Sequence, residues 1–287
     1  MNICSSAIKH MFSKNSWGYM SVLAVYFIFN VTKETSMASI VISVISLLVS
    51  MCSTFYYTRK SNQLSVRARI TDLIDKIYNL AYDRICLQLN KEQGYTSKLA
   101  EKQLRMKHLL FEIDDLAQNE PLSQSQNRLL AESFDDLLYF DYAQKYWDKV
   151  FEKSFVTPEL EAEYYRRYGQ FLYTTGDYAK AYTIFEKSLT LSNDSENRKI
   201  INFQTYTDWA ELEFKREVHN YYLSKGNLKD ICLPKFENVY TILQKANSLL
   251  EQFKSYSFYN NAVEDYDHII MLITAFKNKH LQQIQNV

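Results

Sequence analysis

An uncharged run from Ser36 to Tyr57, SMASIVISVISLLVSMCSTFYY, constrains the fold of this chain more than any other stretch. As a helix its 22 residues would extend roughly 33 Å, slightly more than the roughly 30 Å hydrocarbon core of a bilayer. Arg59 and Lys60 follow after a single threonine. The run therefore predicts a membrane-spanning helix whose C-terminal end has a basic cytoplasmic border.

Serines recur in this run at steps of three and four residues, so a helix would align them in one narrow stripe. This packing stripe consists of Ser36, Ser39, Ser43, Ser46, Ser50 and Ser53. Small polar residues allow membrane helices to approach one another closely. The stripe therefore predicts helix packing, either against a neighbouring helix of the same chain or between protomers of a homo-oligomer.

A second apolar run, residues 17–31, precedes the first and follows Lys9 and Lys14. It could be the core of a cleaved signal peptide or a short first spanning helix. No small-x-small cleavage site follows it cleanly, and another apolar helix begins a few residues later, so we favour the spanning helix. The connection 32–35 is so short that the two helices would form an antiparallel transmembrane hairpin within residues 1–60.

Positive residues flank both outer ends of this hairpin, whereas its turn holds one Lys and one Glu. The positive-inside rule then places both termini in the cytoplasm. We predict a multi-pass protein with two helices in the lipid bilayer, in a bacterial inner membrane, with residues 61–287 forming a cytoplasmic body.

The composition favours an all-α protein, because the chain has only 5 Gly and 3 Pro, and 47% of its residues are hydrophobic. Its four cysteines are far apart in sequence, which excludes a CxxC metal pair and gives no disulfide framework. That pattern is typical of a reducing cytoplasm.

Charge is distributed unevenly, although the formal net charge is zero. Residues 59–110 contain 11 Lys and Arg against 5 Asp and Glu, whereas residues 111–287 contain 19 against 27. Anionic lipid would favour a basic segment beside the membrane helix, but solvated helix faces would give the same counts. An acidic body argues against a nucleic-acid partner.

Residues 61–120 are predicted to form juxtamembrane helices. Apolar residues at helical spacing form a seam of two heptads: Val66, Ile70, Leu73, Ile77 and Leu80. This seam is about one residue out of phase with the serine stripe. Either the helix breaks near Ser61-Asn62, or its two faces meet different partners. A second helix is expected over 99–117, ended by Pro121.

Residues 121–287 read as successive helix-turn-helix units, of which Glu161–Asn193 is the clearest. Large and small residues alternate in its first helix at Tyr165, Tyr168, Gly169 and Leu172, and in its second at Ala181, Phe185 and Ser188. A turn at 176–178 separates the two helices. This unit resembles a tetratricopeptide repeat, although Asn193 stands where the family has a closing proline.

A weaker copy lies 38 residues earlier, with Asn127 at the first aromatic position. Its matches are Leu130, Ala131 and Phe134, then Ala143, Trp147 and Val150. A third, divergent unit begins around Trp209, with lengthened helices. A C-terminal capping helix is expected over 258–285. The resemblance implies an α-solenoid that binds a protein or peptide in a concave groove lined by the first helix of each repeat.

Carried over by position, the resemblance implies a protein-binding groove formed by outward residues of the two better repeats. These are Arg128, Glu132, Asp135, Asp136, Arg166, Gln170, Tyr173 and Thr174. Solvated helix surface is the alternative for each of them.

Catalytic signatures are missing from the sequence. The five histidines are scattered without metal-ligand spacing, and there is no HExxH, GxSxG, phosphate loop or dinucleotide fingerprint. We therefore predict no catalytic residues, no metal and no cofactor, and a protein that is not an enzyme.

Two functions remain from different classes. The first is a membrane-anchored scaffold or adaptor whose cytoplasmic groove docks a protein partner. The second is a membrane effector of the bacterial defence or toxin type, whose hairpin oligomerises and perturbs the bilayer under control of the helical body. A passive anchor is a third alternative.

Overall fold

The computed structural model describes residues 37–90, 95–118, 120–191, 196–224 and 233–285. Within these ranges all regular structure is helical, which confirms the all-α prediction. The expected helix at 17–31 and the turn at 32–35 lie outside the described residues. None of the helices formed within those ranges combines the length and apolar character required to span a bilayer.

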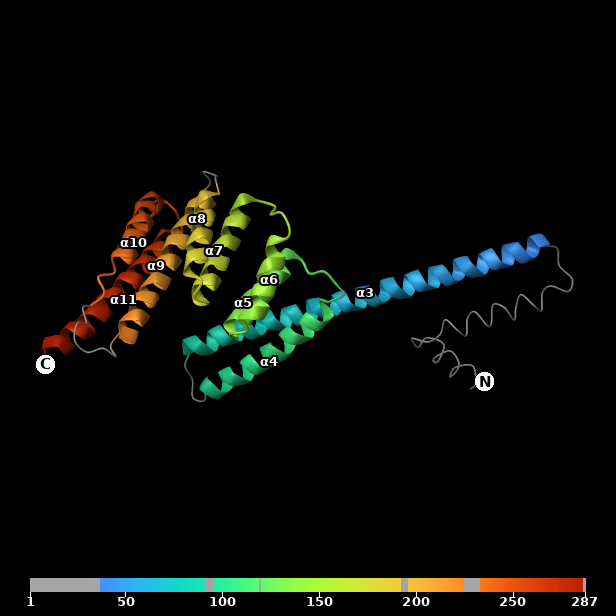
Figure 1. Cartoon of the computed structure of the whole chain (residues 1–287), viewed down its shortest axis with the longest axis horizontal. Coiled ribbons are helices and arrows are strands. Elements are labelled where there is room, and N and C mark those ends of the chain that lie inside the picture. Colours follow the sequence, from blue (N-terminus) through green and yellow to red (C-terminus); the bar gives the residue numbers. More distant parts are fainter. Residues whose placement is uncertain (1–36, 91–94, 119, 192–195, 225–232, 286–287) are drawn as a thin grey trace. The chain divides into compact units, whose positions relative to one another are not determined.

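Helix α3 runs from Met37 to Asn90 without interruption (Figure 1). It continues as helix through Ser61-Asn62, so the break proposed there is wrong. The sequence is compatible with continuity because no Gly or Pro occurs between residues 37 and 90. The apolar seam of α3 is confirmed, since Ile70, Leu73 and Ile77 are buried and Val66 and Leu80 are half-buried.

The chain divides into two compact units. The first holds residues 1–76 and 116–120, and the second holds residues 77–115 and 121–287. Within the described part of the first unit, Arg67 Nε on α3 donates a hydrogen bond to the buried carboxylate of Glu120 at 2.8 Å.

The second unit contains the remaining helices, several of which follow one another as pairs (Figure 1). They are α4 (Tyr95–Leu116), α5 (Gln124–Asp136), α6 (Phe140–Phe151), α7 (Pro158–Thr174), α8 (Tyr178–Thr190), α9 (Glu196–Ser224), α10 (Glu237–Leu250), the 3₁₀ turn η1 (Glu251–Phe253) and α11 (Tyr259–Gln285). Helix α5 packs on α6, α7 on α8 and α9 on α10, while α7 also contacts α5 and α9.

Local sequence explains where these helices begin. Ser123 caps α5 in a reciprocal capping box with Gln126. Thr157 caps α7, and Pro158 occupies its first turn, where a missing N–H is harmless. Gly176 has a φ of 88°, a left-handed conformation that suits the tight connection between α7 and α8.

The core of the clearest helix pair follows the large–small pattern of the sequence. A Cβ atom added at Gly169 would lie 2.8 Å from the ring of Phe185, so glycine is what permits α8 to approach α7 this closely. Ala181, Phe185 and Ser188 are completely buried. Trp209 of α9 stacks on Phe185 with ring centroids 5.3 Å apart, which joins the next helix to this pair.

Candidate interaction surface

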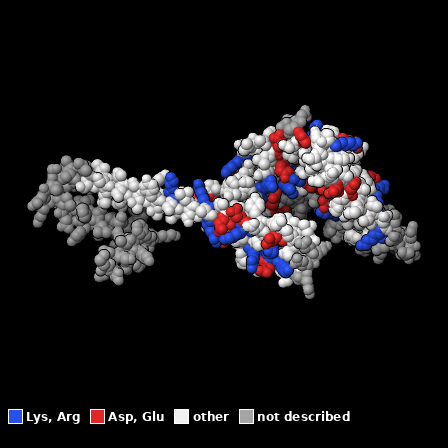
Figure 2. Space-filling model, turned by 180° about the vertical axis from the view of Figure 1, so that it is seen from behind, with Lys and Arg blue, Asp and Glu red and all other residues white. Residues whose placement is uncertain are grey.

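The first helices of two successive pairs, α5 and α7, carry the groove residues singled out from the sequence. Asn127 of α5 and Tyr165 of α7 are both buried, so these two residues mark the core-facing sides of their helices. Polar residues on the opposite sides form the solvent-accessible surface. Figure 2 shows acidic and basic side chains interleaved over the helical body.

Arg166 lies inside an ion-pair network between α7 and α9. Its guanidinium donates to Glu163, one turn earlier on α7, at 2.8 Å, and to Asp208 of α9. Only 6% of the Arg166 side chain is exposed. Burial by itself would lower the pKa of Arg166, but Asp208 and Glu163 outweigh it and raise that pKa. Burial raises the pKa of Asp208, and Arg166 opposes that change.

A second network joins α7, α8 and α9 around the carboxylate of Glu213. Tyr173 of α7 and Tyr182 of α8 both donate to its Oε2 atom, the latter at 2.7 Å. Arg216, one turn later on α9, donates to the other oxygen. Burial would raise the pKa of Glu213, but these three donors overcome it and lower that pKa. A buried carboxylate is tolerated here because donors satisfy both of its oxygens.

Three carboxylates on α5, Glu132, Asp135 and Asp136, form what we call the acidic patch. Burial, together with Asp136 and Glu132, raises the pKa of Asp135 to about 6. Its Oδ1 atom is buried and accepts no hydrogen bond from any described residue. Asp135 and Asp136 are also the last two residues of α5, where the helix dipole disfavours negative charge.

Cations around the acidic patch compensate it only in part. Arg128 lies 3.1 Å from Glu132, but burial still outweighs Arg128 and Arg167 and raises the pKa of Glu132. Burial raises the pKa of Asp136 too, although Arg84 of α3 lies 3.5 Å away. The cations near the patch therefore offset the effect of burial on these carboxylates only in part.

The structure separates the residues predicted for the groove into two groups. Arg166 and Tyr173 are buried in the networks that join α7 to α9, so they are not available to a ligand in this conformation. Arg128, Glu132, Asp135, Asp136, Gln170 and Thr174 keep exposed or half-buried side chains. Arg128 also stacks on the Tyr164 ring at 4.9 Å, and Gln170 accepts from Arg167 at 3.4 Å.

Sequence reasoning did not identify the α9 residues that complete these networks, Asp208 and Glu213. They flank Trp209, the one feature that marks the third unit. Glu213 follows Trp209 by four residues, so the two side chains share a helix face. That spacing was the signal in the sequence that could have placed Glu213 beside the core.

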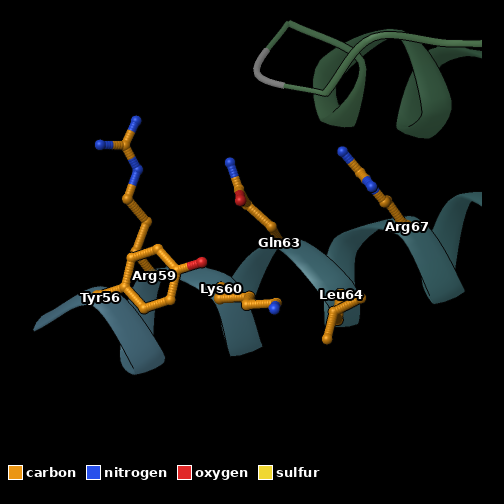
Figure 3. Close-up of a pocket in the computed structure, with 6 residues that line it drawn as sticks. All are labelled: Tyr56, Arg59, Lys60, Gln63, Leu64 and Arg67. Carbon is orange, nitrogen blue, oxygen red and sulfur yellow. The ribbon is translucent and has the colours of Figure 1, made fainter. Parts of the chain in front are cut away.

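A second surface lies on α3 and is formed by one helix alone. It is an open recess lined by Tyr56, Arg59, Lys60, Gln63, Leu64 and Arg67, which we call the basic recess. Figure 3 shows Arg59, Gln63 and Arg67 projecting from the same side of the helix, as their steps of four residues require. Lys60 Nζ lies 5.9 Å from the centre of the Tyr56 ring, a cation–π contact.

The serine stripe lies only partly within the described side chains. Ser43, Ser46, Ser50 and Ser53 are exposed on α3. Ser36 lies outside the described residues. Ser39 lies within α3, but its side chain is not described.

Throughout the described ranges, no group of three or more His, Cys, Asp or Glu side chains is arranged to hold a metal ion. Comparison with protein-family models, with curated proteins and with solved structures found no match to this chain. The function of these surfaces is therefore inferred from the residues that form them.

Proposed function

We propose that this protein is a membrane-anchored scaffold whose tetratricopeptide-like helical body binds a basic segment of a partner protein at the acidic patch. The observation that carries the membrane part is the exposed apolar surface of α3. Several large apolar side chains between Ile45 and Tyr57 are more than half exposed, among them Leu48, Val49 and Phe55. Contiguous apolar surface of this kind requires a cover.

The residues that flank this apolar surface indicate that lipid covers it in this proposal. The uncharged run extends back to Ser36, and Arg59 and Lys60 follow its C-terminal end. Tyr56 and Tyr57 stand at that border, where amphipathic rings prefer to sit in a bilayer. In this proposal the hairpin of residues 1–60 is the anchor, and both termini face the cytoplasm of a bacterial cell.

Anchoring is tested by alkaline carbonate extraction of membranes that contain the full chain. We expect the wild-type chain to stay in the pellet. A variant with Ile45, Leu48 and Val49 changed to Lys should move to the supernatant, because each charge in the hydrocarbon core costs about 3 kcal/mol. A matched control with Lys at exposed Thr183, Glu186 and Thr190 of α8 should stay in the pellet. A wild-type chain that carbonate releases would refute the anchor.

The partner part of the proposal follows from the incompletely stabilised charge of the acidic patch. Burial is the first cause of the raised pKa of each of its carboxylates, and the nearby cations offset it only in part. A partner's Lys or Arg would add a stabilising cation. Asp136, with 61% of its side chain exposed, is the carboxylate of the patch that such a side chain would reach.

A defined probe tests this site: a fluorescent lysine- and arginine-rich peptide titrated against the full chain in detergent. Asp135→Asn with Asp136→Asn should weaken binding about tenfold and reduce its salt dependence. Glu152→Gln, just after α6, with Glu186→Gln on α8 removes the same charge from exposed sites and should leave affinity unchanged. If both double variants weaken binding equally, the effect comes from net charge alone and the acidic patch is not a specific binding site.

A membrane effector is the second candidate, favoured by the exposure of all four described serines of the stripe. Such an effector would depolarise cells on induction, measured with a membrane-potential dye. Ser43, Ser46 and Ser50 changed to Leu should then abolish depolarisation. If induced cells keep their potential, the scaffold is favoured over the effector.

A further inference from the structure

We propose that the basic recess of α3 binds the phosphate headgroup of an anionic phospholipid. This inference rests on the membrane anchor proposed above and adds a specific lipid to it. The recess combines three cations, an amide and an aromatic ring within twelve residues of one helix. Its neighbour toward the N-terminus is the exposed apolar surface that the anchor requires.

The sequence around the recess is positively charged. No Asp or Glu occurs between Glu34 and Asp72, whereas Arg59, Lys60 and Arg67 all line the recess. Arg59 and Lys60 have no carboxylate partner among the residues that the structure describes. Arg67 pairs with Glu120, yet 61% of its side chain is exposed, so it can still reach a second anion.

Position along the helix matches the headgroup layer of a bilayer. That layer is roughly 5–8 Å thick on each side of the hydrocarbon core. At about 1.5 Å per residue, Arg59, Lys60 and Gln63 lie roughly 4–11 Å beyond Tyr56 along the axis. If Tyr56 marks the edge of the hydrocarbon, Arg59 and Lys60 are at the depth of lipid phosphates.

The residue types suit a phosphodiester. Arginine offers a fork of N–H donors to two phosphate oxygens, and lysine adds a mobile point charge. The Gln63 side chain, on the same side of the helix as Arg59 and Arg67, adds a neutral donor. We expect phosphatidylglycerol to be preferred over phosphatidylcholine because the choline of the latter neutralises its phosphate.

Energy transfer from a label on Cys52 provides a local readout. Cys52 is exposed on α3, seven residues before Arg59. The full chain, with its other three cysteines changed to Ser, would be reconstituted in phosphatidylcholine vesicles with a low fraction of acyl-labelled acceptor lipid. We expect transfer to labelled phosphatidylglycerol to exceed transfer to labelled phosphatidylcholine, with about a tenfold preference for the anionic lipid at the site.

The variant Arg59→Gln, Lys60→Gln, Arg67→Gln should abolish this preference. A control with Lys76→Gln, Lys215→Gln and Lys254→Gln removes three exposed cations elsewhere and should keep it. Equal transfer to both lipids in the wild-type chain would overturn the inference. Loss of the preference on adding about 10 mM inorganic phosphate would overturn it too, because the site would then take free phosphate.

The outcome also separates this inference from the anchor. A chain that carbonate washes off neutral vesicles contradicts the anchor itself. A chain that stays in those vesicles but shows no lipid preference contradicts only the headgroup site.

Discussion

Replacing Asp135 by Asn should stabilise the protein at neutral pH and leave it unchanged in acid. Burial, Asp136 and Glu132 raise the pKa of Asp135 from 3.8 to about 6. The folded state therefore binds the Asp135 proton more tightly than the unfolded state does. The stability linked to this proton is fully present below the unfolded pKa and is lost as pH rises through the folded pKa.

The magnitude follows from the size of the shift. About two pKa units correspond to about 3 kcal/mol. Asp135 is half-buried, so solvent screening reduces this to about 1–2 kcal/mol. Asparagine keeps the shape and removes the charge, so the gain should appear above about pH 7 and shrink toward about pH 4.

Thermal unfolding of the full chain in detergent measures this gain. Intrinsic fluorescence can follow it, because Trp147 and Trp209 are buried in the helical body. A gain of about 1–2 kcal/mol corresponds to a rise of about 3–6 °C in melting temperature for a body of this size. Glu186→Gln on exposed α8 surface serves as the control. An unchanged melting temperature at about pH 7.5, or a rise that persists at about pH 4, would refute the reasoning.

Four further substitutions probe the packing, the Glu213 network and the capping described above, each measured by urea unfolding. Gly169→Ala should destabilise by about 1–3 kcal/mol, because its methyl group meets the Phe185 ring. Glu213→Gln should destabilise by about 2–4 kcal/mol through loss of its charged hydrogen bonds, and adding Tyr173→Phe should cost less than the sum of the two single changes. Ser123→Ala should remove about 1 kcal/mol by breaking the capping box.

Local periodicity predicts the helical architecture of the body well. The resemblance to a tetratricopeptide repeat assigns Gly169, Ala181 and Phe185 to the contact between the two helices, and the structure buries all three. Such predictions succeed because residues three and four apart share a helix face whatever the rest of the chain does. The C-terminal helix, expected at 258–285 and found at Tyr259–Gln285, follows the same logic.

Charged residues on that architecture are predicted less well. Position in the repeat places Arg166 and Tyr173 on a free face, but α9 supplies Asp208 and Glu213 to bury them. These partners lie about 40 residues away in sequence. Spacing within one helix shows which way a side chain points, whereas its partner depends on how the next helix packs.

Helix continuity at Ser61-Asn62 illustrates a different limit. A change in the phase of the apolar pattern suggests a break there. A phase change alone does not interrupt backbone hydrogen bonds, and no proline or glycine is present to do so. The alternative interpretation, that different faces of one helix are used along its length, is consistent with buried Ile70 and exposed Leu64 on α3.

The two proposed surfaces respond differently to acid, which makes them separable in one preparation. With a pKa of about 6, Asp135 is mostly ionised at about pH 7.5 and about half ionised at about pH 6. Arginine and lysine side chains ordinarily titrate far above that range. Acidification from about pH 7.5 to about pH 5.5 should therefore weaken binding of the basic peptide and leave the phosphatidylglycerol preference unchanged. A parallel loss of peptide binding and of the lipid preference would mean either that the body unfolds in acid or that the two surfaces are coupled. Asp135→Asn decides between these explanations. If the surfaces are coupled through Asp135, the variant's lipid preference should no longer depend on pH, whereas unfolding driven by other groups should still occur in the variant.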